Sequence, residues 1–291
     1  MLGKGLIKMS KIVFWSPLHG QGQTGNLHII SLIISLLNKK KILMMQTHFT
    51  MNNLEGPLTG RSIDAVSEKN IFQDIGIDAA VMYSTMNSLT DSILESCCIT
   101  FPDTSLLLLP GTEISNYETY ERDISSNIYQ MIQAAENHVD IVMIDTSNGH
   151  DELSFKLMSS ADVIIINLTQ RRYVLNKLFR EYEEIFANKK AFFLFGNYDK
   201  NSGCNIINCR IKYGRYINKD NSGVVPYCSK IIDAQNKSNI VSMVKEGLRS
   251  SKRPSSGEVN YFFKQACLTT TKIMNMLSVE DNKTVVEGRS E

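Results

Sequence analysis

Short, unbroken apolar runs alternate with longer amphipathic stretches along this chain, and this alternation constrains its fold more than any other feature. Parallel strands that helices cover on both faces read as continuous apolar runs. The runs that fit are Lys11–Ser16, Lys41–Gln46, Ser105–Pro110, Asp140–Asp145, Asp162–Leu168, Ala191–Gly196 and, more weakly, Gly223–Tyr227. Helical stretches are Asn26–Asn38, Asn116–Asn137, Glu152–Ser159, Val174–Asn188, Ile231–Arg249 and Glu258–Leu277. The pattern predicts an α/β fold with a doubly wound, mostly parallel sheet of about seven strands flanked by helices.

The alternation runs through most of the chain without an internal repeat, so we expect one large domain over residues 11–277. Residues 1–10 read as an N-terminal extension, and residues 278–291 as a flexible polar tail. Arg249–Gly257 reads as a loop because it is rich in Ser, Pro and Gly.

Charge is almost balanced, with 31 Lys and Arg against 30 Asp and Glu, a net charge of +1. This balance argues against a protein that binds nucleic acid through bulk charge. The densest basic stretch holds Lys245, Arg249, Lys252 and Arg253. Clustered cations of this kind can contact phosphates, so nucleic acid stays open as a weakly supported partner, and a solvated loop is favoured.

The chain shows no sign of membrane insertion or secretion. No stretch approaches the roughly 20 apolar residues of a membrane span, and residues 1–10 lack the apolar core of a signal peptide. The six cysteines include the adjacent Cys97 and Cys98, which suit reduced, buried thiols better than a disulfide framework. We therefore expect a cytoplasmic protein.

The loop after the first run is rich in glycine and leads directly into an apolar helix. Gly20, Gly22 and Gly25 allow tight turns that direct several backbone N–H groups at one anion, and the helix adds its positive end. Thr24, at the start of the helix, offers a hydroxyl for a magnesium ion.

This loop matches only half of the phosphate-binding pattern G-x-x-x-x-G-K-[ST]. The first glycine of the pattern falls at Pro17 and its lysine at Gln23. A glycine turn that merely connects a strand to a helix explains the loop equally well when the loop is taken alone.

The fourth run favours phosphate binding, because it ends in Asp145 and Gly149 follows four residues later. A carboxylate at a strand end can reach a magnesium ion through its water shell. The alternative is an Asp that caps the next helix. An aspartate at this strand end, combined with the glycine-rich loop, indicates phosphate binding more specifically than either feature does alone.

In these features the chain resembles the ParA/MinD family of deviant Walker A P-loop ATPases, and most closely its TadZ-like, pilus-assembly branch. The family's loop K-G-G-x-G-K-[ST]-T corresponds to Leu18–Gly25, and its D-x-x-x-G switch to Asp145–Gly149. The family's adenine-reading asparagine corresponds to Asn197, and its proline near the base to Pro226.

The resemblance implies ATP and Mg²⁺ as cofactors, a homodimer, and partners in a pilus, secretion or positioning complex. It implies Asp145 as a catalytic residue, and Thr24 and Asp145 at the metal. The nucleotide-binding residues that it implies are Gly20, Gln21, Gly22, Gln23, Thr24, Gly25, Asn197 and Pro226.

The departures from the family concern charge. Both loop lysines are replaced, by Leu18 and Gln23, and the acidic residues after the second strand are replaced in Gln46–His48. Losing one preorganised donor at a transition state costs about 2.7–4 kcal/mol. We therefore expect a nucleotide-binding positioning or scaffold protein with weak or absent ATP hydrolysis. Two alternatives stay open: a slow partition-type ATPase that uses Asp145, and a nucleotide-free interaction module.

Overall fold

The computed structural model describes residues 9–49, 54–59, 75–112, 114, 116–251 and 256–278. These residues form an eight-stranded sheet in the order β3-β4-β2-β5-β1-β6-β7-β8. The strands are β1 (Ser10–Trp15), β2 (Ile42–Gln46), β3 (Ile99–Thr100), β4 (Leu106–Leu108), β5 (Ile141–Asp145), β6 (Val163–Leu168), β7 (Ala191–Tyr198) and β8 (Ser222–Pro226). All neighbouring strands are parallel except β3 and β4. The expected doubly wound, mostly parallel sheet is confirmed. No apolar run in the sequence predicted the two-residue strand β3.

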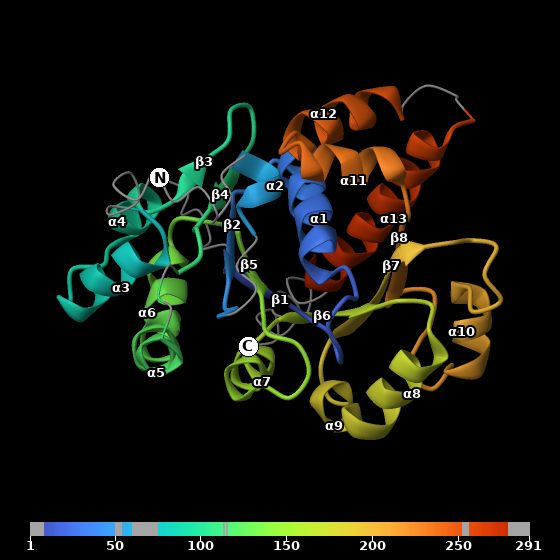
Figure 1. Ribbon diagram of the computed structural model, residues 1–291, viewed down its shortest axis with the longest axis horizontal. Coiled ribbons are helices and arrows are strands. Elements are labelled where there is room, and N and C mark those ends of the chain that lie inside the picture. Colours follow the sequence, from blue (N-terminus) through green and yellow to red (C-terminus); the bar gives the residue numbers. More distant parts are fainter. Residues whose placement is uncertain are drawn as a thin grey trace, which may run out of the picture.

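Helices cover both faces of the sheet (Figure 1). The helices that precede β3 in the chain are α1 (Gln23–Asn38), α2 (Gly56–Thr59), α3 (Ile77–Thr85) and α4 (Asp91–Ser96). A longer helical stretch joins α5 (Tyr117–Tyr120), a π-helical turn (Glu121–Ser125) and α6 (Ser126–Ala135). The rest are α7 (Glu152–Ser159), α8 (Arg172–Glu181), α9 (Glu183–Phe186), α10 (Ile206–Lys212), α11 (Ser229–Asn236), α12 (Ile240–Ser250) and α13 (Glu258–Ser278).

Two stretches that read as single helices are interrupted in the structure. The stretch 174–188 divides into α8 and α9 at Tyr182, whose backbone leaves the helical region (φ −129°, ψ 13°). The stretch 231–249 divides into α11 and α12, because Ser238 adopts a left-handed φ of 54° and the N–H of Asn239 turns back to the carbonyl of Ala234 at 2.8 Å. A left-handed residue ends a helix. The apolar period continues across both breaks, so the sequence pattern did not reveal them.

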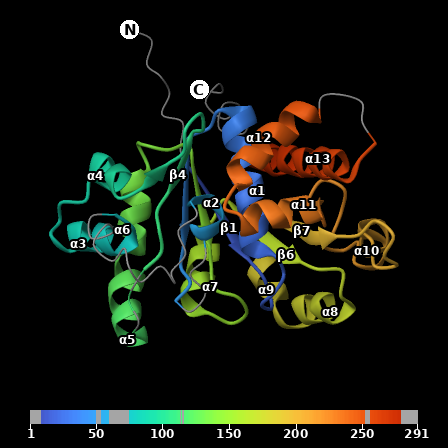
Figure 2. The same ribbon diagram turned by 45° about the horizontal axis from the view of Figure 1, so that its top comes forward.

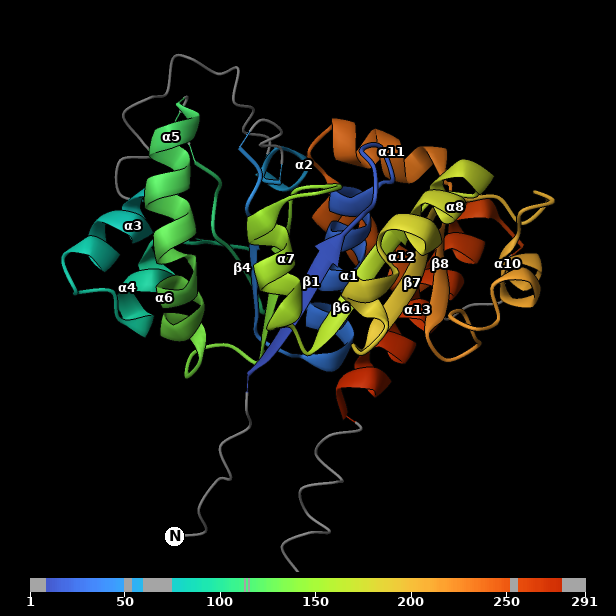
Figure 3. The same cartoon turned by 90° about the horizontal axis from the view of Figure 1, so that it is seen from below.

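The pleat of β1 distributes its side chains between two cores. Ile12 and Phe14 belong to the core that α1, α11, α12 and α13 cover, whereas Val13 and Trp15 belong to the core on the opposite face. Successive side chains of a strand point to opposite faces, so a fully buried strand must be apolar at every position. In the view from below, α7, α8 and α9 lie in front of the sheet and α1 lies behind it (Figure 3).

The strand order determines where a ligand can lie. β1 is central, between β5 and β6, and Asp145 of β5 pairs in register with Phe14 of β1 and Gln46 of β2. Ligands of open parallel sheets bind at the carboxyl ends of the strands. The loop after β1 and the carboxylate of Asp145 therefore meet at the carboxyl ends of the central strands. Helices α3–α6 lie at one end of the molecule and α10 lies at the other (Figure 2).

Some expectations fall outside the described residues. They are the N-terminal extension up to residue 8, the polar tail from residue 279, and the basic residues Lys252 and Arg253. Within the described helices, none combines the length and apolar character that crossing a membrane requires.

Candidate functional site

The glycine-rich loop between β1 and α1 has an open backbone. Gly20 (φ +75°) and Gly22 (φ +74°) both adopt the left-handed region, which favours glycine. Within the described part of the chain, the backbone N–H groups of Gly20, Gln21 and Gly22 make no hydrogen bond. Gly22 also caps α1, so the positive end of the helix lies at the same place. This backbone offers donors to an anion.

The side chain of Gln21 anchors the loop rather than facing a ligand. Its Oε1 accepts hydrogen bonds from the N–H (3.0 Å) and the hydroxyl (2.7 Å) of Thr169, which follows β6. Its Nε2 donates to the carbonyl of His19 at 3.0 Å. The residue is only 3% exposed. The expectation that Gln21 binds the nucleotide can therefore concern only its backbone.

The start of the loop is tied to the segment after β5. The hydroxyl of Ser16 lies 2.9 Å from Oδ1 of Asn148, and the N–H of Gly149 donates to the carbonyl of Ser16 at 2.9 Å. The indole N–H of Trp15 donates to the carbonyl of Gly149 at 3.1 Å. Leu18, at the first lysine position, is partly buried against the core. These bonds hold the loop and the D-x-x-x-G segment as one unit.

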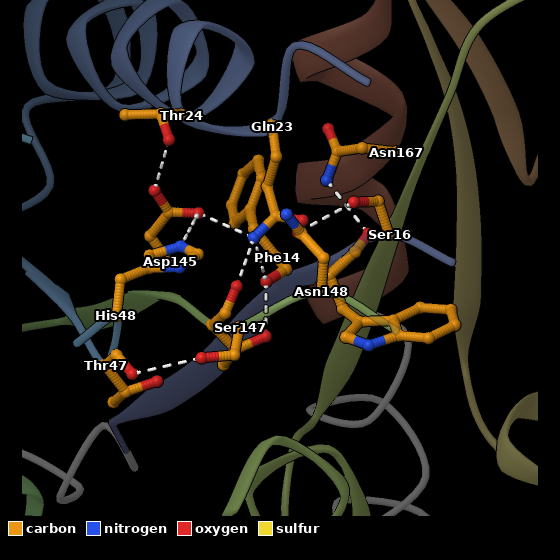
Figure 4. Close-up of polar contacts among 12 residues, drawn as sticks. Phe14, Ser16, Gln23, Thr24, Thr47, His48, Asp145, Ser147, Asn148 and Asn167 are labelled. Carbon is orange, nitrogen blue, oxygen red and sulfur yellow. Dashed lines mark hydrogen bonds and ion pairs between the residues drawn. The ribbon is translucent and has the colours of Figure 1, made fainter. Parts of the chain in front are cut away.

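Gln23 turns its amide away from the loop and toward the carboxyl ends of the central strands β1 and β5 (Figure 4). Its Nε2 lies 2.7 Å from Oδ1 of Asp145, 2.6 Å from the carbonyl of Thr146 and 3.1 Å from that of Phe14. An amide has two N–H donors for these three acceptors, and its Oε1 is buried without a partner among the described residues. The environment would suit a three-donor ammonium, and the chain supplies a neutral amide instead.

Asp145 is completely buried, and protein donors occupy both of its oxygens. The hydroxyl of Thr24 donates to Oδ2 at 2.6 Å, and Gln23 donates to Oδ1. Nε2 of His48 lies 3.6 Å from Oδ1. The predicted metal residues Thr24 and Asp145 are therefore in direct contact. Both amide atoms of the neighbouring Gln46 are buried and unpartnered within the described residues.

A pocket of about 520 Å³ opens beside the first turn of α1. It brings together five of the predicted residues, Gly22, Thr24, Gly25, Asn197 and Pro226. The other lining residues are Asn26, His28, Ile29, Gly56, Pro57, Val225, Cys228, Ile231, Ile232, Gln235, Asn236, Ser238 and Phe262. Gly20, Gln21, Gln23 and Asp145 do not line it. The pocket therefore lies between the loop and the ends of β7 and β8, with α11 as its outer wall.

Sequence reasoning missed several lining residues. His28 is buried, its Nε2 lies 2.8 Å from the carbonyl of Leu54, and burial lowers the pKa of its imidazole. Gln235 of α11 approaches so closely that a Cβ on Gly25 would lie 3.3 Å from its Nε2. No signal in the sequence pointed to α11, because its contribution depends on how the last strands and helices pack. Asn26 directly follows the loop, and its position could have drawn attention to it.

Comparison with solved structures identifies the fold. No protein-family model and no curated protein matches the sequence. The chain is similar to a ParA family ATPase from Chlorobium tepidum TLS, with 15% identity, a TM-score of 0.66, and coverage of 91% of this chain and 98% of that one.

Two further structures carry nucleotides. The septum site-determining protein MinD from Pyrococcus horikoshii OT3, complexed with Mg-ADP, is 18% identical at a TM-score of 0.63. The alignment covers 89% of this chain and 94% of that one. A proposed plasmid partition protein from Borrelia burgdorferi B31, bound to AMPPNP, is 14% identical at a TM-score of 0.62, with coverage of 94% and 100%. The chain thus has the ParA/MinD fold.

Proposed function

We propose that this chain is a ParA/MinD/TadZ-like protein that binds an adenine nucleotide and positions or scaffolds a larger complex, with weak or absent ATP hydrolysis. The observation that carries the proposal is the pocket of about 520 Å³ beside the open glycine loop. Asn197 and Pro226, at the ends of β7 and β8, lie in its wall. Backbone donors and a helix N-terminus suit a phosphate group, and the pocket beside them has room for a base and a ribose.

The weak hydrolysis follows from the charges around the loop. Transfer of a phosphoryl group requires cations at the phosphates and a group that orients the attacking water. Here Leu18 packs against the core, and the neutral amide of Gln23 donates to Asp145 and to the carbonyl of Thr146. Neither supplies a positive charge at the pocket.

We propose cytoplasmic action as a homodimer, with partners in a pilus, secretion or positioning complex. The fold supports this assignment, because solved proteins of the same fold include a proposed plasmid partition protein and a septum site-determining protein. Sedimentation of the full chain with and without nucleotide tests it. A monomer that nucleotide converts to a dimer supports a switch, and a dimer that nucleotide does not affect favours the nucleotide-free interaction module.

Calorimetric titration of the full chain with ATP, ADP and AMP tests the binding itself. Ile232 is half-buried and lines the pocket, so Ile232→Trp should fill part of the pocket and weaken binding about tenfold or more. Ile207 of α10 is 64% exposed and lies outside the pocket lining, so Ile207→Trp is the matched control. Absence of saturable binding by any of the three nucleotides at millimolar concentration overturns the proposal.

The slow ATPase remains the second candidate, because Thr24 and Asp145 keep the oxygen donors of an ATPase site together. A sensitive assay of phosphate release separates the two. Turnover that Asp145→Asn abolishes, in a protein that still folds, favours the enzyme. Release at the buffer rate in both proteins supports the non-hydrolysing scaffold.

A further inference from the structure

The wall of the pocket carries no formal charge. Among the described residues that line it there is no Lys, Arg, Asp or Glu, and its polar groups are amides, hydroxyls and backbone. The only titratable ring, that of His28, has its pKa lowered by burial, which keeps it neutral at pH 7. The positive potential available to a ligand is therefore that of the loop N–H groups and the end of α1, roughly half an elementary charge.

The side-chain groups that could hold Mg²⁺, the hydroxyl of Thr24 and the carboxylate of Asp145, are hydrogen-bonded to each other. Mg²⁺ demands near-octahedral oxygen ligands and usually keeps several waters. Asp145 is 0% exposed, which leaves no surface for those waters, and its oxygens accept from Thr24 at 2.6 Å and Gln23 at 2.7 Å. An ion bound directly to Asp145 would have to share Oδ2 with Thr24 or Oδ1 with Gln23, or displace that donor. In the described residues no group of three or more His, Cys, Asp or Glu side chains is placed to hold a metal ion. Because Asp145 has no exposed surface for the water shell of Mg²⁺, the arrangement does not fit the metal that the fold family implies.

These neutral bonds satisfy the buried carboxylate without a metal. A buried carboxylate is costly unless donors compensate it, and here a hydroxyl and an amide donate to it while Nε2 of His48 lies 3.6 Å from Oδ1. Gln23 also bonds two main-chain carbonyls, of Phe14 and Thr146, which ties its side chain to β1 and to the end of β5. Release of this side chain toward a phosphate would remove the donor of Asp145 Oδ1 and of the Thr146 carbonyl. The Phe14 carbonyl would keep the N–H and the hydroxyl of Thr146 as donors.

We propose that this pocket binds its nucleotide without a metal ion and prefers a nucleoside monophosphate to a triphosphate. The inference rests on the proposed function and specifies the ligand class of the same site. A phosphate monoester carries about −1.5 to −2 charges at pH 7, and each further phosphate adds negative charge that this wall does not offset. Partial charges of backbone and helix match the smaller charge.

Titration of the full chain with AMP and ATP, each with Mg²⁺ and each with EDTA, tests the proposal. We expect the affinity for AMP to equal or exceed that for ATP, and EDTA to change either affinity by less than about twofold. An ATP affinity that Mg²⁺ raises by about tenfold, above that of AMP, overturns this inference and leaves the proposed function intact. Absence of binding by either ligand overturns both.

A substitution at residue 23 tests the charge argument separately. Gln23→Lys supplies an ammonium with three donors beside three acceptors and is expected to shift the ratio of ATP to AMP affinity by about tenfold toward ATP. Ile207→Lys adds the same charge at an exposed position of α10 outside the pocket lining and should leave the ratio unchanged. Thermal melts of both variants establish that they fold. An unchanged ratio in a folded Gln23→Lys protein contradicts the role of charge in the preference.

Discussion

Asn26 in the first turn of α1 donates through Nδ2 to Oδ1 of Asn167 in β6 at 3.0 Å, and both side chains are buried. Asn167 donates in turn to the carbonyls of Trp15 and Ile165, each at 3.2 Å. The pair thus joins the helix after the glycine loop to two strands of the sheet. A buried, paired amide of this kind holds the first turn of α1 in one position relative to the strand ends.

Asn167→Leu should lower the free energy of unfolding by about 1–3 kcal/mol, because it leaves the buried Nδ2 of Asn26 without its acceptor. Chemical denaturation measures the loss. Asn26→Leu combined with Asn167→Leu should cost less than the sum of the single changes, because no polar atom of the pair is then stranded. Asn188→Leu at an exposed position is the control. Strict additivity in the double variant contradicts a direct interaction.

Gly247 of α12 lies against the ring of Phe263 in α13. A Cβ at this glycine would lie 1.8 Å from Cε2 of the ring, so Gly247→Ala forces the helices apart. Overpacking of a core costs about 1–3 kcal/mol, whereas helix propensity alone predicts a gain of about 1 kcal/mol for the same change. The sign of the shift in melting temperature therefore distinguishes the two effects. Gly257→Ala, where a Cβ meets nothing within 4 Å, should leave the melting temperature nearly unchanged.

Stability should fall as the pH drops below about 6.5 because of His28. Burial lowers the pKa of its imidazole in the folded protein, so the unfolded chain binds the proton at a higher pH than the folded chain does. Stability is therefore full above the unfolded pKa and is lost between the two pKa values, by at most about 1.4 kcal/mol per pH unit. Denaturation midpoints from pH 7.5 to pH 5 measure the slope. His28→Gln should flatten it, and His150→Gln, at an exposed position, should not.

Cys209 should resist alkylation in the folded protein although a second thiol lies close to it. Its sulfur is 3.7 Å from that of Cys204, and burial together with this neighbour raises the pKa of Cys209 to about 12. The thiolate is the reactive form, so its reaction at pH 8 should be slow. Mass spectrometry after iodoacetamide treatment, in buffer and in guanidinium, locates the labels. Equal rates for Cys209 under the two conditions contradict the burial.

The sheet and the location of the site were predictable because both depend on local patterns. Continuous apolar runs identified seven of the strands, and the rule that parallel strands end at one edge placed the loop near Asp145. The breaks at Tyr182 and Ser238 were not predictable, because the apolar period continues across them and only the turn geometry changes.

The side chain of Gln23 illustrates the limit for the site. Its position in the loop indicated a residue that faces phosphate, but in the structure its amide bonds to Asp145 and to two carbonyls at the sheet edge. Those acceptors come from β1 and from the end of β5, about 120 residues further along the chain for the carboxylate. The packing of segments far apart in the chain determines which partners such a side chain bonds. The spacing of residues along the sequence does not reveal that packing.

Residue types and their order alone determined the parallel α/β sheet, the glycine turns at Gly20 and Gly22, and the absence of both loop lysines. Periodicity and backbone sterics are local properties, and every chain with this pattern shares them. Tertiary structure decided that Asp145 is buried under neutral donors and that α11 closes an uncharged pocket beside the loop. Both depend on contacts between segments far apart in the chain, whose energies are settled only when the two cores pack.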